Sequence, residues 1–430
     1  KLAMVAGKLV CTANRRAAIA RDTRISGDML EAAMIAGFTS QGVDVVRLGV
    51  LPTPAATFLT PSLGVDMTVM ITASHNPYYD NGIKLIAASG DKFGDDVTAR
   101  LEAAVVDGEF SFDKEKLGRV SEDKTAAERY KEIALGMGGK ELPLQGLKVV
   151  LDCANGCFSE IMPEVFAKLG ADVTALSCMP DGTNINRDCG SQHIDAMTAK
   201  VRDCGAMLGI AADGDGDRII ICDEKGNRVD GDQIIAFLGK YYKEHNRLKA
   251  DTVVATIVSN PALDRFLEGI GVKCVRSAVG ERYVIEEMKK CGSNIGGEES
   301  GHMVVADYAK TGDTMMAALV IAMGLLQSGK KMSEIFPLFT PMTRKRIDSK
   351  FCGKDEMLAA FELAAFQAEI KQGEADIAGK GRILVRKSGT EPKIQVWVWG
   401  DDVPLATAVS NRIASVLEKA DGFESRKEVL

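Results

Sequence analysis

The sequence predicts an α/β fold: three similar mixed α/β domains followed by a smaller α+β domain at the C-terminal end. The first observation is a unit that occurs three times, in which a short apolar strand ends in a polar turn and an amphipathic helix follows. Strands that alternate with helices are typical of α/β layers with mainly parallel sheets. The second observation is that the last part of the chain changes to a helix, two strands and a final helix. A length of 430 residues allows about three domains.

The elements follow one another in this order. The three units each comprise a strand and the next helix: residues 17–20 with a helix from Ser26, residues 147–151 with a helix over 160–169, and residues 252–258 with a helix from Pro261. Asn260 is the expected N-cap of the last of these helices, because a short polar side chain before a proline suits a helix start. Further apolar runs predict strands at residues 67–71, 207–211 and 219–222.

The remaining elements complete the domain assignment. The apolar run at residues 314–326 predicts a buried helix that is too short to cross a bilayer. In the last domain we expect a helix over 361–370, strands at 382–385 and 393–399, and a helix over 405–417. Boundaries near Pro143, Tyr242 and Pro341 give the domains 1–142, 143–242, 243–341 and 342–430.

Composition excludes several classes of protein. The chain is 46% hydrophobic and 26% charged, as in an ordinary globular protein, and its net charge of −7 argues against a nucleic-acid partner. Ten cysteines without a CxxC pair favour a reducing, cytoplasmic location, and four histidines exclude a His-rich metal site. No secretory signal and no membrane-spanning run is apparent, so we expect no membrane partner.

The most informative segment is Asp213-Gly214-Asp215-Gly216-Asp217-Arg218, in which three carboxylates alternate with glycines. Carboxylates repel one another when a tight turn brings them together, so a cation is expected to neutralise them. An all-oxygen set of ligands suits a hard divalent ion such as Mg²⁺. Arg218 beside it could hold a phosphate, and a metal with a phosphate indicates phosphoryl transfer.

Two other interpretations of this segment fit it less well. An ordinary surface turn rarely has aspartate at every second position. The spacing of Asp213, Asp215, Asp217 and Glu224 fits positions one, three, five and twelve of an EF-hand loop, but the sixth position requires Gly and is Arg218. The flanking residues also predict strands where an EF-hand needs helices. The sequence therefore favours a metal site between strands.

Three further loops contain residues suited to chemistry. The first is Thr72-Ala73-Ser74-His75-Asn76-Pro77, with Lys84 shortly after it; it follows a buried strand, at the edge where α/β sheets bind ligands. The plain alternative is a helix or turn start. A serine hydrolase does not fit, because Ser74 has no G-x-S-x-G elbow.

The other two loops are polar and rich in glycine. In Gly296-Gly297-Glu298-Glu299-Ser300-Gly301-His302, acidic and hydroxyl groups suit sugar hydroxyls, and a polar hairpin turn is the alternative. In the last domain, Arg386-Lys387-Ser388-Gly389-Thr390-Glu391-Pro392 offers cations, hydroxyls and amides to an anion. The loop lacks the Walker A spacing, so a nucleotide is not the obvious anion. A solvated turn is the alternative interpretation.

With these four loops in fixed order in separate domains, the sequence resembles the α-D-phosphohexomutase family. The likeness rests on TASHNP, DGDGDR, GEESGH and RKSGTEP and extends over essentially the whole chain through DTRISG, LPTPA, NPYYDNGIKL, VDGDQI and VGERYV. Within the family, DCANG, NINRDCGS and GGEESGH followed by TGD are similar to the bacterial branch that acts on glucosamine phosphates. The motifs are less specific for the sugar than for the family.

The resemblance implies a mechanism. Ser74 would carry a phosphoryl group, and Asp213, Asp215 and Asp217, with an oxygen of that phosphoserine, would hold one Mg²⁺ per active site. The reaction implied is the reversible conversion of glucosamine 6-phosphate to glucosamine 1-phosphate. Glucosamine 1,6-bisphosphate would be its intermediate and activator.

The resemblance also assigns the other residues. Lys84 and His302 are candidates for general acid/base catalysis, with Lys84 favoured by its closeness to the reacting loop, and Arg218 would support phosphate charge. Residues of two other loops would hold the substrate: Glu298 and Ser300 its sugar, and Arg386, Ser388, Gly389 and Thr390 its nonreacting phosphate. The expected partner is a small hexosamine phosphate, and a homodimer is compatible with the resemblance.

The family pattern is incomplete at one place. Family members carry a Gly-Thr-Asp-Gly-(Ile/Val)-Arg-Gly segment on their first strand, against the active site. The 430 residues, which start Lys1-Leu2-Ala3-Met4, do not include it. A protein without such a segment is expected to lose activity.

Two alternatives to this function stay open at the level of sequence. A phosphomannomutase/phosphoglucomutase acting on another hexose phosphate would share most of these motifs. A non-catalytic sugar-phosphate-binding or calcium-binding protein would keep the pocket without the chemistry, and the presence of Ser74 argues against it.

Overall fold

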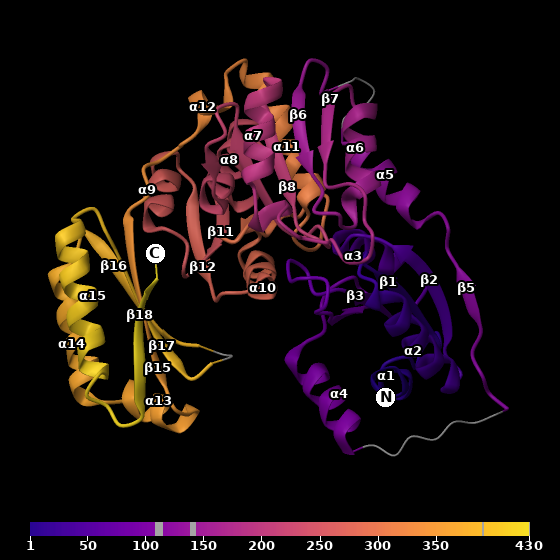
Figure 1. Ribbon diagram of the computed structural model, residues 1–430, viewed down its shortest axis with the longest axis horizontal. Helices are drawn as coiled ribbons and strands as arrows, with labels where there is room; N and C mark the ends of the chain where they lie inside the picture. Colours follow the sequence, from indigo (N-terminus) through magenta and orange to yellow (C-terminus); the bar gives the residue numbers. More distant parts are fainter. Residues whose placement is uncertain (108–114, 138–142, 389–390, 430) are drawn as a thin grey trace. The chain divides into compact units, whose positions relative to one another are not determined.

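The computed structural model describes residues 1–107, 115–137, 143–388 and 391–429 (Figure 1). It divides into two compact units. Unit 1 comprises Lys1–Thr256 and Val275–Leu338, and unit 2 comprises Ile257–Cys274 and Phe339–Leu430.

The first sheet of unit 1 has the strand order β4-β3-β1-β2-β5. Its strands are β1 (Arg16–Arg21), β2 (Asp44–Val50), β3 (Met67–Ile71), β4 (Ile83–Ala87) and β5 (Val120–Glu122), and its helices are α1 (Leu2–Leu9), α2 (Ser26–Ser40), α3 (Thr53–Leu59), the short η1 (Thr60–Ser62), α4 (Asp95–Asp107) and α5 (Ala126–Gly136). All pairs are parallel except β3 with β4. Every residue of β3 is buried, as expected for a strand covered on both faces.

The second sheet has the order β10-β9-β8-β6-β7. It contains β6 (Lys148–Asp152), β7 (Asp172–Leu176), β8 (Leu208–Ala212), β9 (Ile219–Asp223) and β10 (Arg228–Val229), with α6 (Phe158–Lys168), η2 (Gly190–Gln192) and α7 (Asp195–Cys204). Strands β8 and β9 are antiparallel and wholly buried. The loop that joins them is therefore held rigidly from both sides.

The third sheet has the order β12-β11-β13-β14. It contains β11 (Thr252–Thr256), β12 (Lys273–Ser277), β13 (Ile295–Gly297) and β14 (Met303–Val305), and the neighbouring helices are α8 (Gly231–Glu244), η3 (Lys249–Asp251), α10 (Glu281–Cys291), α11 (Thr314–Ser328) and α12 (Met332–Ile335). Strands β13 and β14 form an antiparallel hairpin. Helix α11 is buried almost throughout, as its apolar run predicts.

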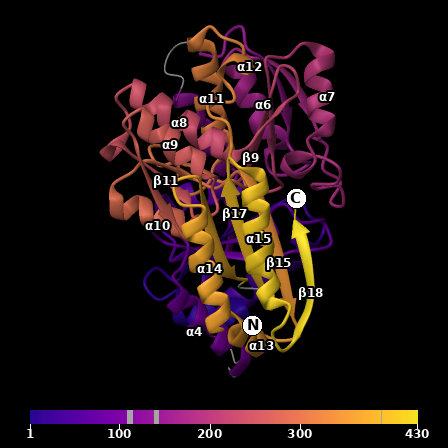
Figure 2. The same cartoon turned by 90° about the vertical axis from the view of Figure 1, so that its left-hand side faces the viewer.

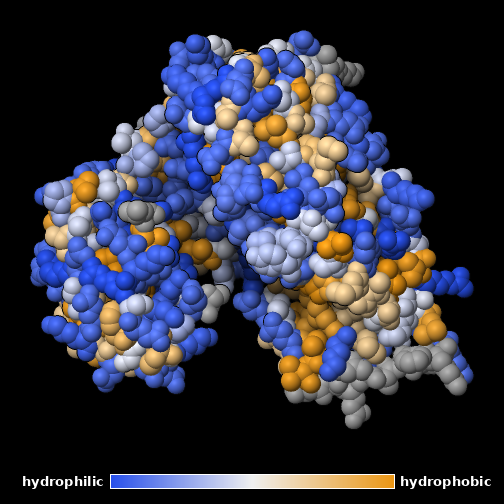
Figure 3. Space-filling model, in the orientation of Figure 1, coloured by the Kyte–Doolittle hydropathy of each residue, from blue (hydrophilic) through white to orange (hydrophobic). Residues whose placement is uncertain are grey.

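Unit 2 contains an antiparallel sheet of order β16-β17-β15-β18. Its elements are α9 (Pro261–Gly269), β15 (Thr343–Phe351), α13 (Lys354–Phe361), α14 (Ala364–Asp376), β16 (Gly381–Lys387), β17 (Lys393–Gly400), α15 (Val403–Leu417) and β18 (Phe423–Val429). Helices α14 and α15 lie side by side over one face of the sheet (Figure 2). Ala262 of α9 packs with Trp397 and Trp399 of β17. In the view of Figure 3, hydrophilic side chains cover most of the visible surface of this unit.

The fold class predicted from the sequence is confirmed, with three α/β domains and a C-terminal α+β domain. The predicted N-cap is also confirmed, because the Asn260 side chain accepts a hydrogen bond from Ala262 N at 3.0 Å. The predicted boundaries near 143, 242 and 341 stay predictions; the one near Tyr242 falls inside α8. None of the helices in the described ranges has the length and apolar character needed to cross a membrane.

The helix predicted over residues 361–370 is confirmed from Ala364 onward, but its predicted start at Phe361 is wrong. Helix α13 ends at Phe361, Leu363 is extended with ψ 127°, and α14 begins at Ala364. Phe361 and Phe366 are five residues apart, a spacing that does not keep two side chains on one face of a continuous helix. The break lets both rings pack into the same core, with ring centroids 6.1 Å apart.

Candidate active site

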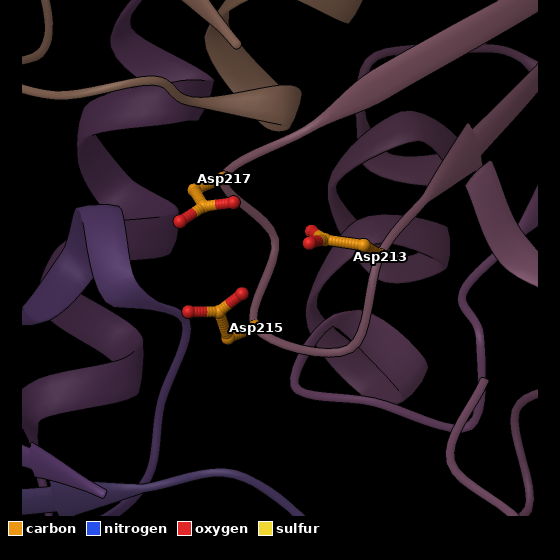
Figure 4. Close-up of side chains that lie close together, drawn as sticks. All are labelled: Asp213, Asp215 and Asp217. Atoms are coloured by element: carbon orange, nitrogen blue, oxygen red, sulfur yellow. The ribbon is translucent and has the colours of Figure 1, made fainter. Parts of the chain in front are cut away.

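The aspartate loop, residues 213–218, connects the antiparallel strands β8 and β9. Strands on both sides exclude an EF-hand, which needs helices there. The carboxylates of Asp213, Asp215 and Asp217 are buried and converge (Figure 4), with one ligand atom from each within 4.8 Å of the others. Gly216 has a φ of +76°, and a Cβ there would lie 2.3 Å from the Phe158 ring. Only glycine fits this turn.

The three carboxylates fit a divalent cation. Asp215 Oδ1 is a buried side-chain oxygen without a hydrogen-bond partner among the described residues, and Asp217 Oδ1 has only the His302 ring nearby, with Nε2 at 3.3 Å. Burial, and then the charges of Asp217 and Asp215, raise the pKa of Asp213 to about 8. Buried acceptors without donors cost free energy unless a cation or a proton satisfies them. An all-oxygen set of this kind suits a hard ion.

Ser74 lies directly against this loop. Its Oγ donates a hydrogen bond to Asp213 Oδ2 at 2.7 Å. Its backbone is in the left-handed region, with φ 51°, and its N–H donates to Thr72 Oγ1 at 2.9 Å. A non-glycine residue in this region is held there by its surroundings and is typical of functional sites. The structure thus brings together the predicted nucleophile and the predicted metal ligands, which are 139 residues apart.

Arg24 and Asn186, to which the sequence assigned no role, hold the Ser74 loop through hydrogen bonds to its backbone carbonyls. The Arg24 guanidinium is fully buried and donates from Nη2 to Ser74 O at 2.9 Å and to Asn76 O at 2.8 Å. Its Nε donates to Asp22 Oδ2 at 2.8 Å, which compensates its charge. Asn186 Nδ2 donates to the same two carbonyls, at 2.9 Å to Ser74 O and 3.1 Å to Asn76 O.

Lys84 of β4 bridges two of the aspartates. Its Nζ donates to Asp215 Oδ2 at 2.6 Å and to Asp217 Oδ2 at 2.7 Å. Burial would lower the pKa of Lys84, but the two carboxylates raise it well above its usual value. Lys84 is therefore held protonated. Thr53, at the first turn of α3, also bonds Asp215, through Oγ1 to Oδ2 and through N–H to the backbone oxygen.

His302 connects the third loop to the aspartates. Its Nδ1 donates to Glu298 Oε2 at 2.8 Å, and its Nε2 lies 3.1 Å from Arg218 Nε and 3.3 Å from Asp217 Oδ1. Burial lowers the pKa of His302, but Asp217 and Glu298 outweigh it and raise the pKa to about 10. Arg218 Nε can donate a hydrogen bond to His302 Nε2 only when the imidazole ring is neutral. When the ring is protonated, Nε2 would instead donate to Asp217 Oδ1.

The other residues of the third loop differ in their surroundings. Glu298 is buried, and both carboxylate oxygens already have partners in the protein, His302 on Oε2 and the Gly280 N–H on Oε1 at 2.9 Å. Ser300 is exposed, with Oγ 3.4 Å from His302 Nδ1. The loop connects β13 and β14 as a hairpin, so the alternative interpretation as a polar hairpin turn is correct for its backbone. The sugar contacts stay predictions.

The fourth loop belongs to unit 2. Arg386 lies on β16 opposite Gln395 of β17, and the Ser388 N–H donates to Lys393 O at 2.9 Å. Gly389 and Thr390 lie outside the described residues. The part of this loop that is described is thus a β-hairpin end that carries a partly exposed Arg386.

The functional residues that the sequence did not reveal lie in segments that were noted only for their resemblance to the family. Arg24 is in DTRISG, Thr53 in LPTPA and Asn186 in NINRDCGS. A buried arginine beside an aspartate two residues earlier gives no periodic pattern, and a carbonyl clamp depends on tertiary contacts. No feature of the sequence alone could have indicated which carbonyls these side chains bind.

Comparison with protein families agrees with this geometry. Models of the phosphoglucomutase/phosphomannomutase family match residues 1–111 as α/β/α domain I, 129–226 as domain II, 230–342 as domain III and 348–416 as the C-terminal domain. The chain therefore belongs to the phosphoglucomutase/phosphomannomutase family, the α-D-phosphohexomutases, whose members are enzymes.

Relatives named phosphoglucosamine mutase match nearly the whole chain. The one from Paramagnetospirillum magneticum is 45% identical over 428 residues, which cover 98% of this chain and 94% of the relative. The one from Rhodospirillum rubrum is 43% identical over 424 residues, with the same coverage of 98% and 94%.

Solved structures share the fold at low sequence identity. A phosphoglucomutase/phosphomannomutase family protein from Burkholderia thailandensis has a TM-score of 0.81 at 22% identity, over 98% of this chain and 94% of that chain. An N-acetylphosphoglucosamine mutase from Aspergillus fumigatus, solved in complex with GlcNAc-6P and magnesium, has a TM-score of 0.65 at 17% identity, over 85% of this chain and 92% of that chain.

Proposed function

We propose that this protein is a phosphoglucosamine mutase that interconverts glucosamine 6-phosphate and glucosamine 1-phosphate through a phosphoserine at Ser74. The observation that carries the proposal is the 2.7 Å bond from Ser74 Oγ to Asp213 Oδ2, in a cluster of three buried carboxylates. The relatives that are 43–45% identical bear the same name. Two solved structures of the fold contain GlcNAc-6P with magnesium and glucose 1,6-bisphosphate.

The metal expected at the aspartate loop is one Mg²⁺, held by Asp213, Asp215 and Asp217 with an oxygen of the phosphorylated Ser74. When bound, it neutralises negative charge on the transferring phosphoryl group. The chain itself supplies the position of the nucleophile, because Arg24 and Asn186 fix the carbonyls on both sides of His75.

The proton is moved by groups around the aspartates. Phosphoserine would give its phosphoryl to the free hydroxyl of the sugar phosphate, which loses a proton, and the resulting 1,6-bisphosphate would return the other phosphoryl to Ser74 after reorientation. Lys84, held protonated by Asp215 and Asp217, fits a general acid for the leaving Ser74 oxygen, and its neutral amine would then take the proton that the sugar hydroxyl loses. His302 and Arg218 are the further candidates for proton transfer and for phosphate charge. Glu298, Ser300, Arg386, Ser388, Gly389 and Thr390 stay the proposed substrate contacts.

Substitution of Ser74 tests the proposal. Purified protein is supplied with Mg²⁺, glucosamine 1,6-bisphosphate and glucosamine 6-phosphate, and intact mass and product are followed. We expect a covalent gain of one phosphate at Ser74 and turnover, whereas Ser74→Ala should lose both and keep sugar-phosphate binding. Turnover by Ser74→Ala would overturn the covalent mechanism. Faster turnover of glucose or mannose phosphates would place the protein with the phosphoglucomutases and phosphomannomutases.

Two wider expectations go with this function. All ten cysteines are free thiols, which fits a reducing compartment, so we propose a cytoplasmic enzyme. A homodimer stays a prediction, which light scattering of the purified protein tests.

A further inference from the structure

Two cysteines that the proposed mechanism does not use lie together at the carboxyl ends of β6 and β7. Cys153 directly follows β6, and Cys178 is two residues beyond β7. The Cys153 N–H and the Cys178 thiol both donate to the same acceptor, Leu176 O, at 3.1 Å and 3.2 Å. Cys189 lies nearby, where its sulfur accepts from Asn155 Nδ2 at 3.9 Å.

The shared acceptor Leu176 O and the strand register bring Cys153 and Cys178 close together. Asp152 of β6 pairs with Leu176 of β7 in parallel register, so the two cysteines follow paired residues on adjacent strands. Adjacent strands lie about 4.8 Å apart, and a disulfide needs Cα atoms within about 7 Å.

The two thiols differ in reactivity. Cys178 is half-buried, and the neighbouring Cys153 thiol lowers the pKa of Cys178, although burial opposes this. Cys153 is fully buried, and the neighbouring Cys178 thiol, followed by burial, raises the pKa of Cys153 well above its usual value. An accessible thiol of lowered pKa is the one that oxidants attack, and a neighbouring buried thiol can resolve the product.

The segment that follows Cys153 leads to both catalytic loops. The Cys157 N–H donates to Gly214 O of the aspartate loop at 2.9 Å, and a Cβ at Gly156 would lie 2.2 Å from that oxygen. Ala154 O accepts from the Asn186 N–H at 2.9 Å, and the Asn186 side chain holds the Ser74 carbonyl. Any shift of residues 153–157 therefore reaches the metal ligands and the Ser74 loop through tightly packed backbone.

We propose that Cys153 and Cys178 form a redox-responsive dithiol, which a peroxide oxidises to an intramolecular disulfide that slows phosphoryl transfer. The Cys178 thiolate attacks one oxygen of hydrogen peroxide, giving a sulfenic acid and, after protonation, one water. The Cys153 sulfur then attacks the Cys178 sulfur and displaces a second water. Two thiols lose two electrons and two protons in total, and the peroxide is reduced to two waters. A thiol reductant reverses the change.

The test uses the full-length protein exposed to hydrogen peroxide and then to an alkylating agent. When oxidised and untreated protein are both alkylated in denaturant, we expect the oxidised protein to carry two fewer alkyl groups, and its digest to contain the Cys153–Cys178 cross-linked peptides. Cys178→Ser should not form the cross-link. Cys204→Ser removes another partly buried thiol of the same domain, on α7, and should form the cross-link as the parent does. Peroxide that only adds oxygen to Cys178, without a cross-link, overturns the proposal.

The effect on the catalytic loops is measured on the same samples. This part of the test rests on the proposed function. We expect oxidation to lower mutase turnover at least threefold and dithiothreitol to restore it. The Cys178→Ser variant should keep its turnover after exposure to peroxide. A cross-link formed without loss of turnover overturns the regulatory part. A reduced protein without mutase turnover refutes the proposed function and leaves the cross-link test standing. The rise of Tm with Mg²⁺, which we expect to shrink on oxidation, then reports the coupling.

Discussion

Ser74 is fixed by contacts to its backbone as much as by contacts to its side chain. Four hydrogen bonds from Arg24 and Asn186 end on the carbonyls of Ser74 and Asn76. They hold the left-handed turn that aims the Ser74 Oγ at Asp213. Since phosphoryl transfer depends mainly on position and electrostatics, this clamp is expected to contribute directly to rate.

Removal of one side of the clamp should slow the reaction. In Asn186→Ala, two hydrogen bonds of about 1 kcal/mol each are lost, so we expect kcat to fall by roughly tenfold or more. KM should stay within about threefold, because the Asn186 side chain bonds the protein's own carbonyls and not the proposed substrate. Steady-state kinetics on glucosamine 6-phosphate measures both.

Asn184→Ala is the matched control for this prediction. Asn184 lies in the same segment, and its side chain bonds Met179 O at 2.9 Å and the Asp181 N–H at 2.9 Å, away from Ser74. We expect near-parental kcat for this variant. Equal kcat values for Asn184→Ala and Asn186→Ala would contradict a positioning role for Asn186.

At the scale of elements, continuous burial made the central strands predictable. Residues 219–222 are an unbroken apolar run and residues 67–71 are apolar except for Thr68, and these segments are most of β9 and β3. The break between α13 and α14 was not predictable, because it follows from how Phe361 and Phe366 pack against a shared core. Local pattern therefore located the strands, while tertiary packing decided where one helix ends.

Helix α11 carries a titratable cap whose effect on stability is testable. Asp313 accepts from the Met316 N–H at 3.2 Å and from the Tyr130 hydroxyl at 2.8 Å. Burial raises the pKa of Asp313 from 3.8 to about 7, although these bonds oppose the rise. The folded state therefore binds a proton between these pH values that the unfolded state does not. This stabilisation is complete below pH 3.8 and is lost as pH rises through about 7.

Asp313→Asn removes the titration and keeps a residue that can cap the helix. Relative to the parent, this variant should gain stability as pH rises from about 4 to about 7, by at most about 1.4 kcal/mol per pH unit. Urea unfolding of both proteins at several pH values gives the difference. Parallel curves for the two proteins would show that Asp313 stays ionised in the folded state.

At the scale of the whole molecule, the two units report on different events. Both tryptophans of the chain, Trp397 and Trp399, lie on β17 of unit 2. The proposed ligands of Mg²⁺ all lie in unit 1. Tryptophan fluorescence therefore follows the unfolding of unit 2, whereas far-UV circular dichroism is dominated by the larger unit 1.

Metal binding should separate these two transitions. A ligand stabilises only the structure that binds it, so Mg²⁺ should raise the Tm followed by circular dichroism more than the Tm followed by fluorescence. Addition of EDTA should remove the difference. Coincident transitions with and without Mg²⁺ would show instead that both units unfold as one cooperative system.

The sequence predicted the chemical groups of the candidate site but not the side chains that position them. The alternation of Asp213, Asp215 and Asp217 with glycines identified the carboxylate cluster, since few other arrangements require that composition. The order of the motifs indicated Ser74. Arg24 and Asn186 could not be identified from sequence, because their role depends on which distant carbonyls the folded chain brings to them.

The path of the chain between the units has a practical consequence. The chain crosses from one unit to the other after Thr256, after Cys274 and after Leu338. A single proteolytic cut at any one crossing leaves the other two peptide links intact, so nicked protein should remain one particle under native conditions. For the same reason, a fragment that starts at Phe339 would leave α9 behind and expose the tryptophan face that it covers. Modular exchange of this unit between relatives therefore requires two separate grafts.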